Sequence, residues 1–426
     1  MGAWLRRMGG ETRMTKQAAQ ALENVRICDF TGQLAGAGAT KILAAFGAEV
    51  IRIEDPVHRG KWDILRGVPP WVGDARGLEA GGAFNNHNAG KLGVTLNLRE
   101  PRAKELLREL VAVSDAVTEN FAAGVMERLG FGYESLREIR NDIVYVSNNG
   151  FGATGPYSPF KSWGPIAQAV SGLTHTSGLP DLPPAGWGYS FMDHTGGYYM
   201  ATAILMGLLH RQRTGEGQWV DLACIEAAGT LNGVATLDAT VNQRPMRRPG
   251  MPNSNRSYSP QMAPHGIWRT RGEDEWVAIA VRNDDDWKAM SEVIGEPWST
   301  EKRWERIETR LRDESELEQQ LAEWTITRDR REIAQRLVDV GVPAAPVLKP
   351  QERIEFDQRT AELWVTVDHT EIGKSRVEGL PVSLSETPWT LKRGAACLGE
   401  HNDYVFGELL GLSEQEIMSL AEEGVI

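Results

Sequence analysis

The sequence predicts an α/β fold, with a large domain built on a parallel sheet covered by helices and a smaller α+β domain. Two observations lead to this prediction. Short apolar runs typical of strands alternate with helix-like segments through the first half of the chain, which is the pattern of a parallel sheet with crossover helices. The length of 426 residues also exceeds what one core of ordinary size accommodates.

The alternation begins at residue 25. Residues 25–30 and 48–54 are rich in branched and apolar side chains and are predicted as strands, and the Gly/Ala-rich stretch between them ends in a helix. A strand, a helix and two further strands are predicted at residues 91–98, 101–114, 115–120 and 141–152. A long helix is expected from about Asp193 to His210, followed by a strand at 219–224 and a helix at 225–237.

The second half of the chain changes character after residue 242. Residues 242–264 are polar and weakly periodic, which indicates a connecting or active-site loop. A β-hairpin at 265–281 and three helices at 285–295, 315–326 and 331–341 follow. We therefore expect an N-terminal extension at 1–24, a large α/β domain at 25–228, a linker at 229–262, a small α+β domain at 263–341, and a linker with a C-terminal part returning to the large domain at 342–426.

Composition excludes several classes of function. A formal net charge of -12 argues against nucleic acid or an anionic membrane surface as the main partner. The first 20 residues hold no apolar stretch typical of a secretion signal, and no window approaches the ~18 apolar residues of a membrane span. The three cysteines form no C-x-x-C pair and the eight histidines show no zinc-ligand spacing. We expect a cytoplasmic protein without disulfides or metal.

Asp193 precedes the long apolar helix in the run SFMDHTGG. Its simplest interpretation is a helix N-cap, because aspartate is favoured there. The same place brings the carboxylate near the positive end of the helix dipole and among small residues that a thioester could approach, and a carboxylate is a competent covalent nucleophile. The local sequence leaves both interpretations open.

Two basic residues are candidate contacts for an anionic ligand. Arg52 ends the second predicted strand and Lys91 follows the run FNNHNAG. Charged residues at the carboxyl edge of a parallel sheet commonly face the ligand crevice, although a solvated strand end and a turn lysine explain them equally well. The glycines of GQLAGAGATK match neither G-x-x-x-x-G-K-[ST] nor G-x-G-x-x-G, so a nucleoside triphosphate or dinucleotide site is not expected.

Several segments, taken in order, resemble the class III CoA-transferase family, whose relatives include formyl-CoA transferase, carnitine CoA-transferase and the α-methylacyl-CoA racemases. The marks are VRICDFTGQLAGAGATK, NNHNAGKLGVTLNL, NNGFGATGPYS and the block from Asp193 to Gln218. The resemblance implies a Rossmann-like large domain and a homodimer of interlocked chains. It also implies that coenzyme A and acyl-CoA are substrates and that no cofactor is permanently bound.

In this family the nucleophile is an aspartate two residues before a small-residue pair, and Asp193 occupies that place. The resemblance implies that CoA passes from an acyl-CoA donor to a carboxylic acid acceptor through an aspartyl-CoA thioester, with succinyl-CoA a natural donor by analogy. The implied CoA contacts, with Lys91 added as a candidate phosphate contact, are Arg52, Lys91, Asn120, Phe121 and Arg128.

The sequence departs from the family pattern in ways that leave alternatives. The family's active-site glutamine aligns with Leu34, one position after Gln33, and Asn149 replaces a family lysine. The racemases exchange an α-proton with a His and an Asp, and neither occurs at the matching places in NNGFGATG and in WGPIAQ. An acyl-CoA racemase or isomerase of the same fold and a non-catalytic acyl-CoA-binding protein remain the alternatives to a transferase.

For the identity of the donor and acceptor acids, the sequence offers only its aromatic content as an indication. The chain has 14 tryptophans, and most of them are expected in the core. The family places four of them in loops around the active cleft: Trp62, Trp71, Trp163 and Trp187. A bulky or aromatic acyl group would suit such a cleft. Three basic residues near Trp62 are candidates to hold a second carboxylate: Arg59, Lys61 and Arg66.

Overall fold

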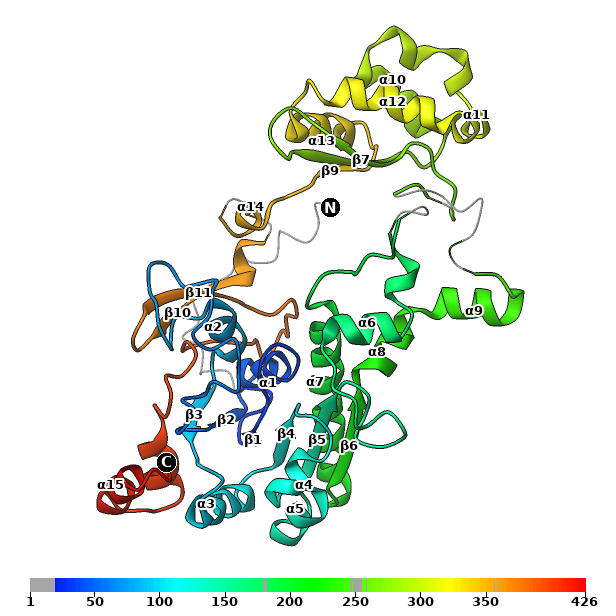
Figure 1. Cartoon of the computed structure of the whole chain (residues 1–426). Coiled ribbons are helices and arrows are strands. Elements are labelled where there is room, and N and C mark those ends of the chain that lie inside the picture. The colour runs from blue at the N-terminus through cyan, green and yellow to red at the C-terminus, as the bar shows by residue number, and fades with distance from the viewer. Residues whose placement is uncertain are drawn as a thin grey trace. The chain divides into compact units, whose positions relative to one another are not determined.

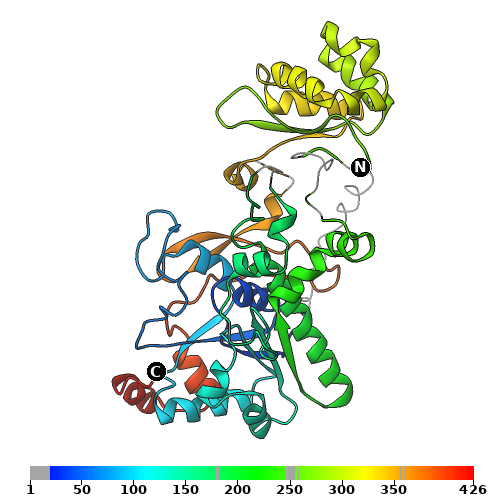
Figure 2. The same ribbon diagram turned by 45° about the vertical axis from the view of Figure 1, so that its right-hand side comes forward.

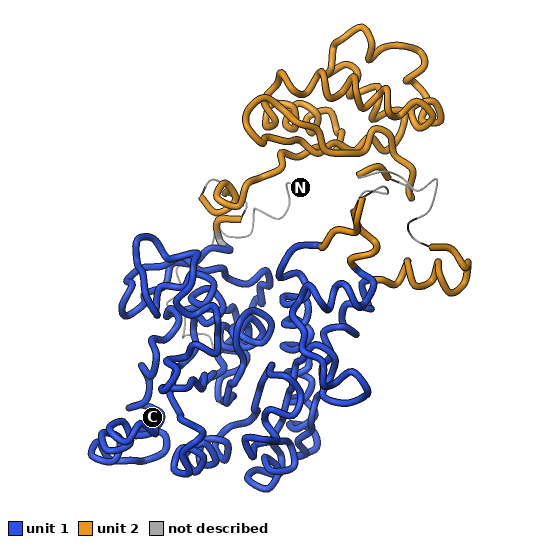
Figure 3. Tube along the Cα trace, in the orientation of Figure 1, with its two compact units in different colours: residues 1–173, 187–231, 362–426 blue, residues 174–186, 232–361 orange. Residues whose placement is uncertain are grey.

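The computed structural model describes residues 20–178, 182–245, 247, 255–257, 259–355, 357–358 and 360–426. The chain forms two compact units (Figure 3). Unit 1 comprises residues up to Leu173 together with Trp187–Leu231 and Glu362–Ile426, and unit 2 comprises Thr174–Gly186 and Asn232–Ala361. Relative to the limits expected from sequence, the short loop after Leu173 and the stretch from residue 342 to 361 group with unit 2. The N-terminal extension lies almost entirely outside the described residues.

Unit 1 is built on a six-stranded sheet in which every neighbouring pair of strands is parallel, in the order β3-β2-β1-β4-β5-β6 (Figure 1). The strands are β1 Arg26–Asp29, β2 Glu49–Glu54, β3 Leu92–Thr95, β4 Ala116–Glu119, β5 Val144–Asn149 and β6 Gln218–Ala223. This confirms the predicted α/β class with a parallel sheet. The central strands are almost fully buried, as expected for a sheet covered on both faces.

Helices cover both faces of the sheet (Figure 2). One face, with Ile27 and Val146, packs against α1 Ala35–Ala45 and α7 Phe191–Thr214. The opposite face, with Cys28 and Tyr145, packs against α3 Pro101–Ala112, α4 Val125–Leu129, α5 Tyr133–Ile139 and α15 Glu414–Glu422. Successive strand residues point to opposite faces, so two separate cores form from one run of apolar residues.

The carboxyl ends of the parallel strands meet at one edge of the sheet, and the loops that follow β1, β4 and β5 lie there. The strand order reverses between β1 and β4, and this is the place where open α/β sheets bind ligands. The helix α7 passes close to α1 near this edge, because a Cβ atom on Gly197 would lie only 2.7 Å from the backbone oxygen of Ala35. The fold therefore brings the start of α7 next to the loops of the sheet.

The last part of the chain returns to unit 1. The antiparallel hairpin of β10 Trp364–His369 and β11 Gly373–Glu378 is held by the Glu378 backbone N–H, which donates to the Asn86 side chain of α2 Gly82–Asn88 at 2.7 Å. Further on, Asn402 accepts from the backbone N–H of Thr95 on β3 at 3.0 Å. A π-helical turn at Asp403–Leu409 and α15 complete the core on one face of the sheet.

Unit 2 holds a three-stranded antiparallel sheet and four main helices. The strands are β7 His265–Arg269, β8 Trp276–Ala280 and β9 Ala344–Pro346, and the helices are α10 Asp284–Ile294, α11 Ile307–Arg312, α12 Glu314–Thr325 and α13 Arg330–Asp339. The predicted hairpin and the three predicted helices are confirmed. Four tryptophans fill its core, which agrees with the expectation that many of them are structural: Trp268, Trp287, Trp304 and Trp324.

Outside these elements, α6 Gly164–Val170, α8 Cys224–Leu231, α9 Gly233–Asn242 and α14 Pro350–Glu355 complete the helices. The one helix predicted after β6 is divided into α8 and α9 at Asn232. The prediction missed α2, because its Asn-rich sequence resembles a turn. Within the described ranges, no helix combines the length and apolarity needed to cross a membrane.

Candidate active site

A cavity of about 370 Å³ lies at the carboxyl edge of the unit 1 sheet. Its wall is formed by residues 32–35 after β1, 120–123 after β4, 148–151 at the end of β5, and 160–164 before and at the start of α6. Asp193 on α7 and Cys224 on α8 also line it. The aromatic wall residues are Trp62, Phe121, Phe151, Phe160, Trp163 and Tyr189.

Asp193 lies in the first turn of α7, which begins at Phe191 with Ser190 as its N-cap residue. The predicted start of the helix at Asp193 was therefore two residues late, and the N-cap interpretation of Asp193 is wrong. Burial raises the pKa of the Asp193 carboxyl, while His194 and the residue's own backbone N–H oppose that rise. The carboxylate is thus a partly desolvated acid in the wall of the cavity.

Gly164 makes room for this carboxylate. A Cβ atom on Gly164 would lie 2.3 Å from Oδ2 of Asp193, well inside contact distance. Gly164 opens α6, and the sequence showed it only as part of the run WGPIAQ. Glycine is needed here because another side chain approaches its Cα directly, and no local pattern reveals such a contact.

Asn148, a buried residue of β5, lines the cavity next to Asp193 and connects β5 with α7 and α8. Its amide donates to the carbonyl of Gly196 at 3.5 Å and accepts from the thiol of Cys224 at 3.2 Å. Burial and the neighbouring Asp193 charge raise the pKa of Cys224 to about 12. The thiol therefore stays protonated at neutral pH and acts as a hydrogen-bond donor, not as a nucleophile.

Asn120 and Phe121, both predicted as CoA contacts, lie in the cavity wall. The Asn120 amide accepts from the N–H of Gly32 at 2.8 Å and donates to its carbonyl at 3.0 Å. The N–H of Phe121 donates to the buried Glu119 at 2.6 Å, and burial raises the pKa of Glu119 to about 7. Side chains at the end of β4 thereby tie together two loops of the cavity.

The three predicted basic contacts lie elsewhere. Arg52 is buried, and its guanidinium donates to the Thr31 carbonyl, to Asn88 and to Asp63 at 2.6, 3.0 and 2.8 Å. Lys91 is buried against Asp29 at 3.3 Å, and burial lowers its pKa to about 8. Arg128 is exposed on α4. None of the three lines the cavity, and their contact with CoA stays a prediction.

Lys161 was not considered from the sequence, yet it lines the cavity. It lies in the polar segment PFKSWG, where a lysine resembles any solvated loop residue. Of the basic residues near Trp62, Arg66 is buried in ion pairs with Glu54 and Glu79. Arg59 and Lys61 are exposed and do not line the cavity. Among the described wall residues, Lys161 is the cation available to an anionic substrate group.

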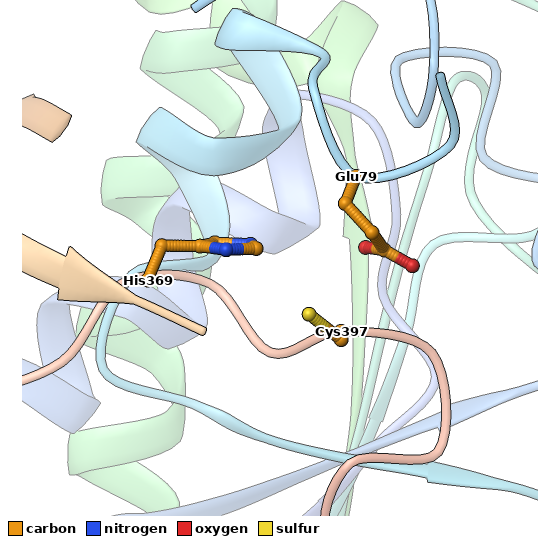
Figure 4. Close-up of side chains that lie close together, drawn as sticks. All are labelled: Glu79, His369 and Cys397. Atoms are coloured by element: carbon orange, nitrogen blue, oxygen red, sulfur yellow. The ribbon is translucent and has the colours of Figure 1, made fainter. Parts of the chain in front are cut away.

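Glu79, His369 and Cys397 form a second cluster of chemically active side chains, and the three point toward one another (Figure 4). Nδ1 of His369 accepts from the N–H groups of Glu371 and Ile372 at 3.1 and 3.3 Å. The neutral ring therefore carries its proton on Nε2, which leaves no lone pair there for a metal ion.

The other two side chains of this cluster are a paired carboxylate and a protonated thiol. Glu79 is paired with the buried Arg66 and accepts from the N–H of Leu398 at 3.2 Å. Burial, with the charge of Glu79, raises the pKa of Cys397 to about 12, so the thiol is protonated at neutral pH in the metal-free protein. The cluster joins the C-terminal segment to the rest of unit 1.

Comparisons with known proteins agree with this site. The family model described as CoA-transferase family III matches residues 22–402. A Streptomyces coelicolor protein named formyl-CoA:oxalate CoA-transferase is 34% identical over 421 residues, which cover 96% of this chain and 100% of that protein. A Chloroflexus aurantiacus protein named succinyl-CoA–D-citramalate CoA-transferase is 29% identical over 414 residues, which cover 97% and 100%.

Among solved structures, a CAIB/BAIF family protein from Brucella suis superimposes with a TM-score of 0.83 at 27% identity, covering 92% of this chain and 100% of that one. The family match spans almost the whole chain, and the curated relatives are matched over their full length. This chain therefore belongs to CoA-transferase family III.

Proposed function

We propose that this enzyme transfers CoA from an acyl-CoA donor to a carboxylic acid acceptor with Asp193 as covalent nucleophile. The supporting observation is that Asp193 is the carboxylate in the wall of the unit 1 cavity, partly desolvated and facing the small Gly164. A desolvated carboxylate attacks a thioester more readily than a hydrated one.

In the first half-reaction the Asp193 carboxylate attacks the thioester carbonyl of the donor. The C–S bond breaks, CoA leaves as a thiolate, and a mixed anhydride forms. The thiolate then attacks the Asp193 carbonyl, which releases the donor acid and gives the aspartyl-CoA thioester.

In the second half-reaction the acceptor carboxylate attacks this thioester, CoA leaves as a thiolate, and a second mixed anhydride forms. The thiolate then attacks the acceptor carbonyl of this anhydride, which gives the new acyl-CoA and frees the Asp193 carboxylate. Backbone N–H groups of the turn at 149–151 are candidates to stabilise the oxyanions.

Replacement of the nucleophile tests this mechanism. Asp193→Ala is expected to lower CoA exchange between labelled acid and acyl-CoA more than about 1,000-fold, with an unchanged circular dichroism spectrum, because the covalent route is lost. Hydroxylamine added during turnover should inactivate the wild type and convert Asp193 to its hydroxamate, detected by peptide mass spectrometry. Exchange above a thousandth of the wild-type rate in the variant would remove Asp193 from this role.

Two alternatives share the fold. A racemase needs a proton-exchange pair, yet the described cavity wall contains one acid, Asp193, and no histidine. A non-catalytic acyl-CoA-binding protein would bind the thioester without a covalent step. Recovery of an unmodified Asp193 peptide from the hydroxylamine experiment, together with tight acyl-CoA binding, favours the binding protein, and loss of an α-deuterium label from acyl-CoA favours the racemase.

The acids that we propose are bulky, and one candidate class carries a second carboxylate. Aromatic wall residues such as Trp62, Phe121 and Trp163 suit a large acyl group, and Lys161 could pair with a second carboxylate. Two relatives are named for formyl-CoA with oxalate and for succinyl-CoA with D-citramalate, and these names leave both small and larger acids open. Succinyl-CoA remains the proposed donor.

A donor-by-acceptor matrix decides between these acids. Succinyl-CoA, acetyl-CoA and formyl-CoA are combined with small, branched, aromatic and dicarboxylic acids, and the products are quantified by mass spectrometry. We expect the larger acids to have the higher kcat/KM, and Lys161→Ala to lower kcat/KM roughly tenfold for dicarboxylic acids but little for monocarboxylic ones. Efficient use of formate and oxalate alone would exclude a bulky substrate.

We also propose that the enzyme is a homodimer of interlocked chains. Apolar side chains lie exposed along one stripe of α9, at Val234, Leu237 and Val241, and none of its residues is buried. The long helix α7 also exposes Met206 and Leu209. An amphipathic helix with its apolar stripe in water is typical of a surface that another chain covers.

A further inference from the structure

The segment from Thr31 to Gln33 joins β1 to α1 and forms part of the wall of the cavity that holds Asp193. Gln33 has a φ of +56°, in the left-handed region that residues other than glycine rarely adopt. Such backbone strain persists only where the surroundings impose it, and it is concentrated at functional sites. A glycine would adopt this conformation at lower cost, and because Gln33 also lines the cavity its side chain is a candidate for contact with a substrate.

Asp63 imposes this conformation. Its Oδ2 accepts from the backbone N–H of Gln33 at 2.9 Å and from Nη2 of Arg52 at 2.8 Å. Nη1 of the same arginine donates to the carbonyl of Thr31 at 2.6 Å. Both Asp63 and Arg52 are almost completely buried, so water does not weaken this ion pair. The pair therefore holds the segment at both ends.

Two further side chains hold the middle of the segment at Gly32. The Asn120 amide binds both the N–H and the carbonyl of Gly32. The ring of Trp62 covers the same residue so closely that a Cβ atom on Gly32 would lie 2.3 Å from it. Backbone groups of Thr31, Gly32 and Gln33 are all held by these contacts. In this segment the Gln33 side chain is therefore the group that can reorient toward a substrate.

We propose that Asp63 is a positioning residue, which holds the Gln33 backbone so that the Gln33 amide donates a hydrogen bond to an oxygen of the acyl or carboxylate group next to Asp193. The proposal rests on the proposed transferase function. Arg52, expected from the sequence to contact CoA, acts here as the buried counter-charge of Asp63. Asp63 touches no substrate in this arrangement and acts only through Gln33.

A double-mutant cycle tests this role. Asp63→Ala, Gln33→Ala and the double variant are compared by kcat/KM for CoA exchange. If Asp63 acts through Gln33, Asp63→Ala lowers kcat/KM at least tenfold in the wild-type background and less than twofold in the Gln33→Ala background. A merely structural role gives equal losses in both backgrounds, and this result would overturn the proposal. Asp63→Asn keeps one oxygen that can accept from the Gln33 N–H but removes the buried counter-charge of Arg52, so its kcat/KM should lie between those of the wild type and Asp63→Ala.

Glu79→Ala serves as the matched control. Glu79 is also a buried acid paired with an arginine, Arg66, but it does not line the cavity or contact Gln33. Its variant should lower stability without any coupling to Gln33→Ala. If Asp63→Ala does not fold, Gln33→Gly decides: a higher melting temperature with at least a tenfold lower kcat/KM supports the proposal, and an unchanged kcat/KM overturns it.

A binding measurement separates failure of this proposal from failure of the transferase mechanism. Acetonyl-CoA is a thioether analogue of an acyl-CoA that keeps the carbonyl oxygen but cannot transfer its acyl group. Its dissociation constant, measured by calorimetry across the same cycle, should show the same coupling between Asp63 and Gln33. Coupling in binding without any exchange activity would overturn the proposed transferase mechanism while supporting the positioning role, and additive effects in binding would overturn that role.

Discussion

Gly164 decides how close another residue can come to the reacting carboxylate. Since a Cβ atom there would lie 2.3 Å from Oδ2 of Asp193 and 3.2 Å from the backbone oxygen of Tyr189, Gly164→Ala must displace the Asp193 carboxylate and shift the Tyr189 carbonyl slightly. We expect kcat to fall roughly 100-fold, because a displacement of about 1 Å at a reacting group has that effect. The free energy of unfolding should change by less than about 1 kcal/mol.

Gly229→Ala is the control for this prediction. A Cβ atom at Gly229 would meet no neighbour within 4 Å, and the residue lies in α8, so the substitution should leave activity unchanged and raise the free energy of unfolding by up to about 1 kcal/mol. Steady-state kinetics and urea unfolding on both variants check the prediction. A Gly164→Ala enzyme with wild-type kcat would show that the Asp193 carboxylate does not need its observed position.

The helix α7 carries Asp193 and packs closely against α1 at Gly197. A Cβ atom there would lie 2.7 Å from the backbone oxygen of Ala35, which cannot move aside as a side chain does. Gly197→Ala should therefore separate the two helices and lower the free energy of unfolding by about 1–3 kcal/mol. Activity should fall as well, because Asp193 lies one turn earlier on the same helix. Urea unfolding and exchange assays, again with Gly229→Ala as control, measure both effects.

Most elements of this fold could be predicted because their signals are local. Runs of buried strand residues and the periodicity of α10, α12 and α13 indicate their own secondary structure. The ends of elements were less certain, and α7 begins at Phe191, two residues before the expected start. Ser190 and Asp193 are both residue types favoured at an N-cap, so the local pattern does not distinguish between the two starts, and Ser190 makes no side-chain cap in the structure.

At the scale of the molecule, the exposed stripe of α9 predicts self-association. Sedimentation velocity at about 1 μM should give a single species of twice the chain mass of 47.1 kDa, because a covered apolar stripe and interlocked chains both oppose dissociation. Leu237→Glu should reduce the yield of this species by placing a charge in the stripe.

Ala239→Glu adds the same charge to α9 outside the stripe and should leave the dimer intact. A monomeric wild type at micromolar concentration would contradict the interlocked arrangement, since such chains separate only by unfolding. Equal effects of the two glutamate variants would instead show that the stripe is not part of the dimer surface.

The sequence by itself determined the α/β class, the family and the candidate nucleophile, because these follow from local periodicity and from the order of short motifs along the chain. Tertiary structure alone decided which charged side chains can reach a substrate in the cavity. Arg52 is buried and donates to Asp63 and Asn88, whereas Lys161, in a polar loop without a recognisable motif, lines the cavity. Gly164 meets Asp193 across 29 positions of the sequence only after α6 and α7 have packed. Contacts between distant residues fix these roles, and no local pattern encodes such contacts.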